Sequence, residues 1–238
     1  MVTILLQARL NSQRLPGKVL FPLQDKTVLG HILTRLKTCR GVADIVICTS
    51  LWPDDTRICE EARHYGVQAY RGGNEDVLGR FAGAAEGYTG SILRFCADNP
   101  FLDPAVLDEG IRQYEAHPVD YMGHAGLPIG LGFEIFTKEA LLQAHRLAAK
   151  DYEREHVTPY IMEHAKTKAV YRYPHDYSRY RLTLDTDEDW RLTQELYQRL
   201  YRGGADGYFG VEDVVGILKE EPELAAINAG VIQRKPGK

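Results

Sequence analysis

The sequence has few cysteines and no long apolar run. Its four cysteines among 238 residues form no C-x-x-C pair and no series with the spacing of zinc ligands. They therefore indicate neither a disulfide framework nor a zinc site, and we expect a chain in the reducing cytoplasm. No stretch approaches the ~18 apolar residues of a membrane span, and the run 2–6 is too short and wrongly flanked for a signal peptide. We expect a soluble protein without a membrane partner.

The chain also lacks an excess of positive charge. It has 29 Lys and Arg against 33 Asp and Glu, a formal net charge of −4, and no basic arm. Binding to nucleic acid is therefore not expected, because that affinity depends on clustered cations. The first 24 residues are a local exception, since they contain Arg9, Arg14 and Lys18 but no acid. This segment predicts a positive pocket for a small anion.

The segment QARLNSQRLPGKVL at 7–20 carries these three cations but lacks the two common nucleotide motifs. Gly17-Lys18 resembles part of a P-loop, yet Ser12 stands where that motif needs glycine and Val19 where it needs Ser or Thr. No G-x-G-x-x-G occurs there either. Arginine and lysine side chains on a loop can still bind a polyphosphate. The alternative is an ordinary solvated loop.

Apolar runs alternate with helically spaced segments over about the first 115 residues. The runs predict strands at 2–8, 44–50, 67–70 and 91–97, and the spacing predicts helices at 27–39, 54–65, 76–88 and 104–117. Strict alternation indicates an α/β fold with a mostly parallel sheet flanked by helices. Ligands of such sheets bind beyond the carboxyl ends of the strands. We therefore expect the loops 9–18, 71–80 and 98–103 to share one rim.

The pattern changes after residue 117. A Gly/Pro-rich bend separates two expected antiparallel strands, 120–124 and 133–137, which predict an inserted arm or subdomain at about 118–176. Further elements are expected as helices at 138–149 and 155–164, strands at 168–173 and 180–185, and a helix at 187–201. We expect one domain over residues 1–232 and a flexible tail at 233–238.

Five segments of the chain follow one another in an order that carries a family resemblance. They are QARLNSQRLPGKVL, YRGGNEDVLGRF at 70–81, RFCADNPFLDP at 94–104, EHVTPYI at 155–161 and RLTLDTDEDW at 181–190. The first is similar to the signature A-R-x-x-S-x-R-L-P-G-K of the sugar-activating cytidylyltransferases, the group of CMP-KDO and CMP-sialic acid synthetases. Together they resemble the spore coat polysaccharide biosynthesis branch of that family, over about residues 2 to 200.

The resemblance implies a Rossmann-like nucleotidyltransferase with an inserted antiparallel dimerisation arm, and hence a homodimer. It also implies magnesium dependence and the transfer of CMP from CTP to a sugar or sugar acid, with release of pyrophosphate, in polysaccharide or glycan biosynthesis. The acceptor stays open, and the choice of CTP rests on the resemblance alone. Three alternatives also stay open: a glycosyltransferase, a nucleotidyltransferase acting on a sugar phosphate, and a non-catalytic nucleotide-binding regulator.

Catalytic roles follow from the resemblance and from the chemistry of phosphoryl transfer, which needs cations around the phosphates and hard oxygen ligands for magnesium. Arg14 and Lys18 are the expected catalytic cations, and Asp98 and Asp185, which end two predicted strands, are the expected catalytic carboxylates and magnesium ligands. Either aspartate could instead cap a turn or helix. Asp187 or Asp189 could share the role of Asp185, and Asp185-Thr186-Asp187 matches the D-x-D spelling of glycosyltransferases.

Six further residues are expected to contact substrate. Arg80 could instead be a surface arginine, and strand alternation alone would face Glu134 to solvent. His156 belongs to the segment that the resemblance places near the acceptor pocket, and its spacing from His164 does not match H-E-x-x-H, so zinc hydrolysis is not supported. The full set is Arg9, Ser12, Arg80, Asn99, Glu134 and His156.

Overall fold

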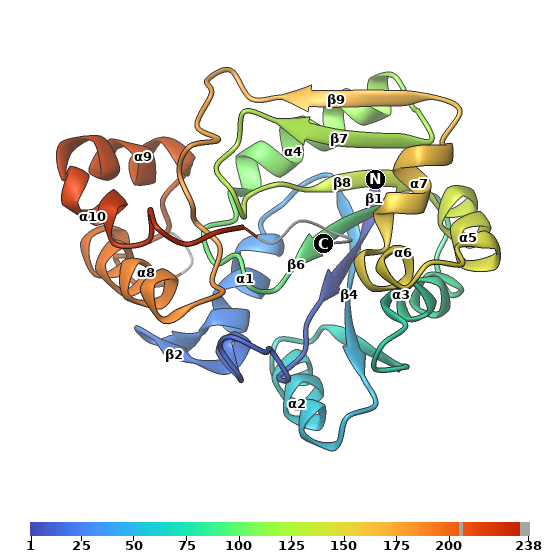
Figure 1. The fold of residues 1–238 in the computed structure, drawn as a ribbon, viewed down its shortest axis with the longest axis horizontal. Coiled ribbons are helices and arrows are strands. Elements are labelled where there is room, and N and C mark those ends of the chain that lie inside the picture. Colours follow the sequence, from blue (N-terminus) through green and yellow to red (C-terminus); the bar gives the residue numbers. More distant parts are fainter. Residues whose placement is uncertain (205–206, 234–238) are drawn as a thin grey trace.

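One seven-stranded sheet runs through the molecule in the computed structural model, which describes residues 1–204 and 207–233 (Figure 1). The strands lie in the order β5-β4-β1-β6-β8-β7-β9. Their bounds are β1 (Val2–Gln7), β4 (Val42–Ser50), β5 (Gln68–Gly72), β6 (Ser91–Cys96), β7 (Tyr121–Ala125), β8 (Glu134–Thr137) and β9 (Lys168–Arg172).

The strands β5, β4, β1 and β6 are parallel, as the alternating pattern predicts. The chain first builds outward from β1 to β4 and β5, and then returns to place β6 on the other side of β1. The loops that follow β1 and β6 therefore leave from neighbouring strands at the same edge of the sheet. Such a reversal of strand order opens a crevice for ligands in open α/β sheets.

The remaining strands extend the same sheet. The expected antiparallel pair is present, because β8 runs antiparallel to both β6 and β7, while β9 is parallel to β7. The expected strand at 180–185 is wrong, since only an isolated bridge joins Ile129 and Arg181 there. The backbone N–H groups of Leu182 and Leu184 donate to the carbonyls of Ile129 and Asp98, which both lie in loops.

Helices cover both faces of the sheet. One face packs against α1 (Val28–Leu36), α2 (Thr56–His64) and α4 (Pro104–Ala116). The helices α8 (Asp187–Leu200), α9 (Val211–Glu220) and α10 (Pro222–Ala226) join the same hydrophobic core and lie to one side of the sheet (Figure 1). The other face is covered by α3 (Val77–Ala85), α5 (Lys138–Leu147) and α7 (Thr158–His164). Successive strand side chains point to opposite faces, so Ile4 and Leu6 join the first core while Leu5 joins the second.

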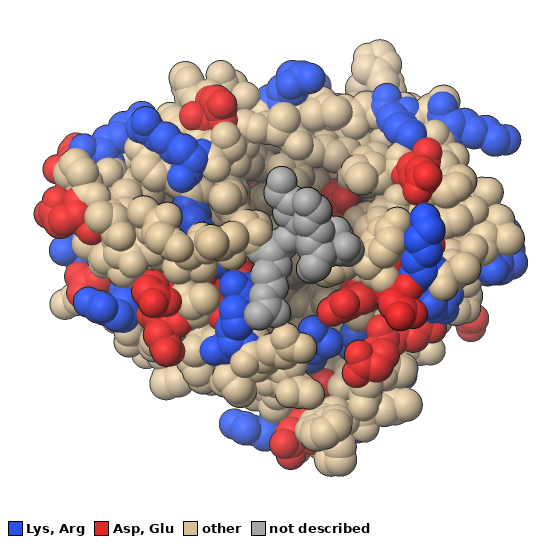
Figure 2. Space-filling view, in the orientation of Figure 1, with Lys and Arg blue, Asp and Glu red and all other residues tan. Residues whose placement is uncertain are grey.

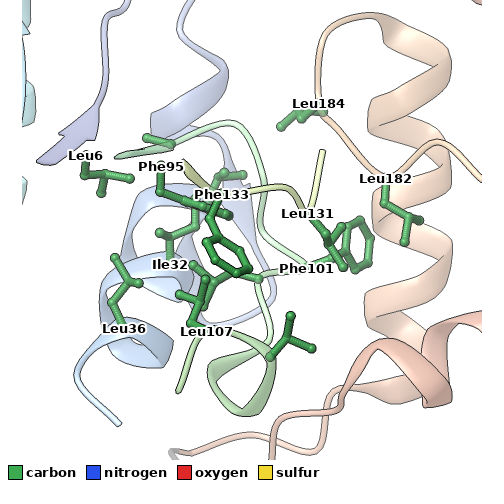
Figure 3. Close-up of a cluster of buried hydrophobic side chains, with 14 of the residues drawn as sticks. Leu6, Ile32, Leu36, Phe95, Phe101, Leu107, Leu131, Phe133, Leu182 and Leu184 are labelled. Carbon is green, nitrogen blue, oxygen red and sulfur yellow. The ribbon is translucent and has the colours of Figure 1, made fainter. Parts of the chain in front are cut away.

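The first core also fixes the segment that precedes α8. Leu182 and Leu184 are buried in it, beside Phe101 and Leu131 (Figure 3). In this extended segment alternate side chains point in opposite directions, so the polar residues between and after the two leucines face away from the core. This alternation explains why the sequence pattern resembles a strand although no strand pairs with it.

The helix expected at 155–164 is present but is interrupted at one residue. Two helices, α6 (Asp151–His156) and α7, meet at Val157, which has a positive φ of 69°. This conformation is strained for a β-branched residue and costs roughly 1–3 kcal/mol. The side chain of Val157 is fully buried in the second core, which offsets that cost. The break allows Glu155 and His156, the last residues of α6, to line the cavity described below.

Several short elements were not expected from the sequence. They are β2 (Pro22–Leu23), β3 (Lys26–Thr27), the 3₁₀ helices η1 (Lys18–Leu20) and η2 (Pro53–Asp55), and the helices α9 and α10. None of the helices in the described part of the chain is long and apolar enough to cross a membrane. The expected flexible tail lies outside the described residues, apart from Gln233.

Candidate active site

A polar cavity of about 390 Å³ opens at the carboxyl ends of β1 and β6. The space-filling view shows this face hollowed at its centre, with acidic and basic side chains around the hollow (Figure 2). Residues of the first loop and of the segment 94–99 form much of the lining, and the rest comes from Ile129, Gly130, Glu155, His156, Thr183, Asp185 and Gln233. A larger cavity of about 570 Å³ lies against α8, α9 and α10, but its lining is mainly apolar and contains no carboxylate. The polar cavity is therefore the candidate active site.

The loop after β1 is folded back on itself. Gly17 has a positive φ of 76°, a conformation that glycine adopts at little cost, and its N–H donates to the carbonyl of Leu10 at 2.8 Å. The buried carboxylate of Asp55 accepts the N–H of Leu10 at 2.8 Å. The first contact joins the two ends of the loop just before η1 begins at Lys18, and the second ties the loop to η2.

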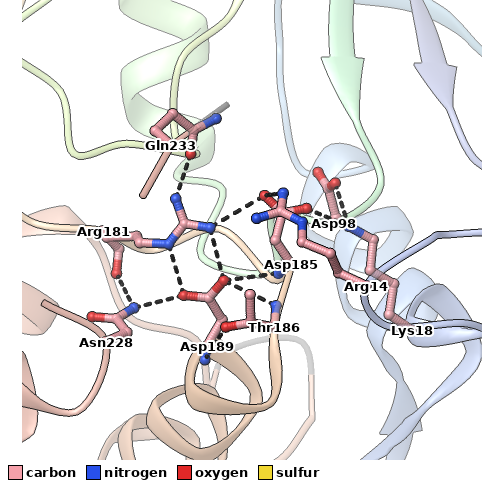
Figure 4. Close-up of polar contacts among 9 residues, drawn as sticks. All are labelled: Arg14, Lys18, Asp98, Arg181, Asp185, Thr186, Asp189, Asn228 and Gln233. Carbon is pink, nitrogen blue, oxygen red and sulfur yellow. Dashed lines mark hydrogen bonds and ion pairs between the residues drawn. The ribbon is translucent and has the colours of Figure 1, made fainter. Parts of the chain in front are cut away.

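Lys18 is the centre of the site (Figure 4). Its Nζ donates to Asp98 Oδ2 at 2.7 Å and to Asp185 Oδ1 at 2.8 Å. Arg14 Nη2 lies 3.0 Å from the other oxygen of Asp185. The cations of the acid-free segment are therefore paired with carboxylates that arrive from distant parts of the chain.

These contacts shift the pKa values of Lys18 and Asp185. Burial alone lowers the pKa of Lys18, but the carboxylates of Asp98 and Asp185 outweigh it and raise that pKa above its usual value. Burial likewise raises the pKa of Asp185, and the charges of Lys18, Arg14 and Arg181 outweigh it and hold that pKa below its usual value. Lys18 and Asp185 are therefore both charged at neutral pH.

The lowered pKa of Asp185 predicts a pH-dependent contribution to stability. A carboxylate whose pKa is lowered by folding stabilises the fold above its ordinary pKa of 3.8, and this contribution is lost as the pH falls through the folded value. We expect Asp185→Asn to lower the Tm at pH 7 and to have a smaller effect at pH 3. Circular dichroism melting of both proteins at the two pH values measures this. An equal Tm difference at both values would contradict it.

The two aspartates fit a divalent cation. Their oxygens converge on one nitrogen, so a single cation can neutralise both. Within residues 1–204 and 207–233, no group of three or more His, Cys, Asp or Glu side chains is arranged to hold a metal. Magnesium in nucleotide enzymes commonly takes one or two carboxylates and completes its shell with water and phosphate oxygens. Two convergent carboxylates in a polar cavity suit that coordination.

The family assignment follows from comparison with known proteins. The sequence model of the cytidylyltransferases matches residues 3–206. The chain belongs to the cytidylyltransferase family. It is therefore a nucleotidyltransferase, and the resemblance carried by the five sequence segments is confirmed.

Three relatives show how far the similarity extends. The spore coat polysaccharide biosynthesis protein SpsF of Bacillus subtilis is 32% identical, with 94% of this chain and 96% of SpsF covered. The 8-amino-3,8-dideoxy-manno-octulosonate cytidylyltransferase of Shewanella piezotolerans is 30% identical over 59% of this chain and 56% of its own length. A cytidylyltransferase structure from Leptospira borgpetersenii superposes with a TM-score of 0.87 at 31% identity, covering 94% of this chain and 96% of that one. The Rossmann-like nucleotidyltransferase fold is thereby confirmed.

Most of the site residues expected from the sequence line the cavity of this cytidylyltransferase. Beside the central cluster, Arg9 lies 3.9 Å from Glu155, and burial lowers the pKa of His156. The Oδ1 atom of Asn99 is buried without a hydrogen-bond partner among the described residues. The expected residues brought together here are Arg9, Ser12, Arg14, Lys18, Asp98, Asn99, His156 and Asp185.

Arg80 does not line the cavity. Arg80 lies on α3 and is 0% exposed, so it is not a surface arginine. Its three guanidinium nitrogens have no hydrogen-bond partner among the described residues. The loop 71–80 leaves from the same edge of the sheet as the other two loops, because β5 is parallel to β4 and β1, but none of its residues lines the cavity. The reason is topological: β5 is separated from β1 by β4.

Glu134 lies behind the cavity wall. Its carboxylate accepts hydrogen bonds from Arg94 Nη1 at 2.8 Å, Tyr121 OH at 2.7 Å and Thr158 Oγ1 at 3.0 Å. Arg94 itself lines the cavity and also donates to Gln7 at 3.3 Å. Arg94 was not among the site residues expected from the sequence, although a lone arginine within the apolar run 91–97 indicates a buried charge that needs a partner.

The two acids considered beside Asp185 point elsewhere. Asp187 is exposed in the first turn of α8, and Asp189 is buried against Arg181. Neither residue lines the cavity. The D-x-D spelling therefore does not place a second carboxylate in this site.

Proposed function

We propose that this cytidylyltransferase transfers CMP from CTP to a sugar or sugar acid, with magnesium and with release of pyrophosphate, for surface polysaccharide or glycan biosynthesis. The observation that carries the proposal is the cluster of Arg14, Lys18, Asp98 and Asp185 in a polar cavity beside the strand-order reversal. The sequence similarity to SpsF along almost the whole chain supports the biosynthetic setting.

The first loop is the proposed binding site for the triphosphate. Negative charge on the phosphates opposes attack by the acceptor, so cations near them lower the barrier. Arg14 can form two parallel hydrogen bonds to phosphate oxygens, while Lys18 supplies a compact charge on a flexible stem. Arg9 also lines the cavity, but it lies 3.9 Å from Glu155, at the end proposed below for the acceptor.

Asp98 and Asp185 are the proposed magnesium ligands. Magnesium, when bound, neutralises charge on the phosphates and helps to orient them for in-line displacement of pyrophosphate. Lys18 donates a hydrogen bond to each of the two carboxylates and so holds them on one side of the cavity. Its charge also helps to hold the pKa of Asp185 below its usual value.

The acceptor is proposed to bind at the end of the cavity formed by Glu155, His156 and Arg94. His156 is half-buried, and its lowered pKa favours a neutral imidazole that can hydrogen-bond a sugar hydroxyl. The Shewanella relative is named for transfer to an octulosonate, which supports a sugar acid as acceptor. Arg94 and Arg9 could then balance the acid group.

A substrate screen tests the proposal. Each of the four nucleoside triphosphates is combined with a panel of sugar acids, neutral sugars and sugar phosphates, with and without Mg²⁺, and pyrophosphate release is measured. We expect release with CTP, Mg²⁺ and at least one sugar or sugar acid. A glycosyltransferase would instead consume a nucleotide sugar without releasing pyrophosphate. A non-catalytic regulator would bind CTP without turnover, and either result would contradict the proposal.

We also predict that the protein is a homodimer. The strand β9 is the last in the sheet, and its Val170 is about half exposed, which leaves backbone and apolar surface for a second copy. Light scattering at micromolar concentration should give twice the chain mass of 26.9 kDa. A clean monomer under the same conditions would contradict the prediction.

A further inference from the structure

Asp185 is held by a second pair of charged residues behind the cavity. Arg181 Nη2 donates to Asp185 Oδ2 at 3.2 Å (Figure 4). The same guanidinium donates through Nε and Nη2 to the two oxygens of Asp189, at 2.8 and 2.9 Å. Arg181 therefore joins the cavity carboxylate to a carboxylate that does not line the cavity.

Asp189 also fixes the backbone of the Asp185 segment. It is only 1% exposed, and its Oδ2 accepts the N–H of Asp185 at 2.9 Å and of Thr186 at 3.1 Å. An ordinary helix cap accounts for the contact with Thr186, the N-cap of α8. A helix cap does not account for the contacts of Oδ1, which accepts hydrogen bonds from Arg181 and from a residue of the C-terminal segment.

That residue is Asn228, which follows α10 and is 3% exposed. Its Nδ2 donates to Asp189 Oδ1 at 2.8 Å and to the carbonyl of Arg181 at 3.1 Å. Gln233 accepts a hydrogen bond from the remaining nitrogen of the guanidinium, Nη1. The family match ends at residue 206, so these two contacts come from a part of the chain beyond it.

We infer that Asp189 is a positioning residue that, with Arg181, sets the orientation of Asp185, and that Asn228 of the C-terminal segment holds this pair in place. The inference rests on the proposed function, because it gives Asp185 the role of a cation ligand. Three fixed groups constrain Asp185: its own N–H is bound, its neighbour's N–H is bound, and one oxygen is bound by Arg181. Partners of this kind behind a ligand fix its direction and typically contribute 10–100-fold to metal affinity.

The test measures cation binding apart from turnover. Mn²⁺ is titrated into the wild type, Asp189→Asn and Asn228→Ala, alone and with CTP but without acceptor, and binding is followed by water-proton relaxation. The matched control is Asp213→Asn, because Asp213 caps α9 in the same way, accepting the N–H of Gly210 at 2.8 Å. The Tm of each variant is measured alongside.

We expect Asp189→Asn to weaken Mn²⁺ binding about tenfold or more, and Asn228→Ala to weaken it less, since only Asp189 contacts Arg181 through both of its oxygens. Asp213→Asn should lower the Tm and leave Mn²⁺ binding unchanged. A lowered Tm with unchanged Mn²⁺ binding in Asp189→Asn would overturn the inference, as would a wild type that binds no Mn²⁺. If Asp189→Asn does not fold, Mn²⁺ binding and Tm are compared for Asn228→Ala instead, and unchanged Mn²⁺ binding in that variant would overturn the inference.

The turnover screen separates this inference from the proposed function. A wild type that binds Mn²⁺ but releases no pyrophosphate, together with weaker binding in Asp189→Asn, would support the positioning role and contradict the proposed reaction. Normal turnover with unchanged Mn²⁺ binding in Asp189→Asn would contradict the positioning role alone.

Discussion

Asp98→Asn and Asp185→Asn should each lower kcat for pyrophosphate release by about a thousandfold or more, since each removes a charged oxygen from the proposed cation site. An asparagine keeps the shape of the side chain but not the negative charge that balances Lys18. The effect should appear in kcat, because the charge acts on the transferring phosphate. Steady-state kinetics with CTP and an acceptor identified by the screen measure it.

Asp187→Asn is the matched control for these variants. Asp187 lies two residues from Asp185 but is exposed and does not line the cavity. Its substitution should therefore leave kcat unchanged. Thermal unfolding shows whether each variant remains folded at the assay temperature. Near-normal turnover in a folded Asp98→Asn or Asp185→Asn protein would remove that residue from the assignment.

Lys18→Ala and Arg14→Ala should each lower kcat/KM for CTP by roughly a hundredfold, on the scale of one charge-assisted contact in a closed site. Both side chains reach the centre of the cavity, and Lys18 is only 6% exposed. The KM for the acceptor should change little, because the proposed acceptor contacts lie at the other end. Varying each substrate separately measures the two effects.

Lys18→Ala has an additional cost, because Asp98 and Asp185 would then face each other without their shared cation. The Tm should therefore fall with the activity. Arg112→Ala controls for the loss of a positive charge, since Arg112 is 67% exposed at the side chain and pairs with Glu109 away from the cavity. Unchanged CTP kinetics in both Lys18→Ala and Arg14→Ala would assign the loop an ordinary surface role.

The sequence predicts those parts of the fold and site that depend on the local pattern of residues. Alternating strands and helices indicate the parallel half of the sheet, and the loops after β1 and β6 carry the residues that meet in the cavity. The pairing of Lys18 with Asp98 and Asp185 could not be predicted from local pattern. These partners lie 80 and 167 residues away in the chain, and only the sheet topology brings them together.

The local sequence pattern gives the wrong structure, or no signal, where contacts between distant segments determine the conformation. Leu182 and Leu184 alternate with polar residues as in a strand, but their backbone groups bond to loops. A positive φ at a buried valine is rare, so the break at Val157 has no sequence signal. Charge alone could not show that Glu134 pairs with Arg94, or that the side chain of Arg80 on α3 is buried.

The cavity is assembled from the first loop, from the ends of β6 and α6, and from Gln233 near the end of the described chain. Contacts between residues so far apart in sequence form late and slowly during folding, since long loops must close first. A fragment that lacks the first loop, β6, α6 or Gln233 therefore cannot form the complete cavity. On refolding, recovery of catalysis will lag behind recovery of helical signal, so activity reports completion of the whole fold.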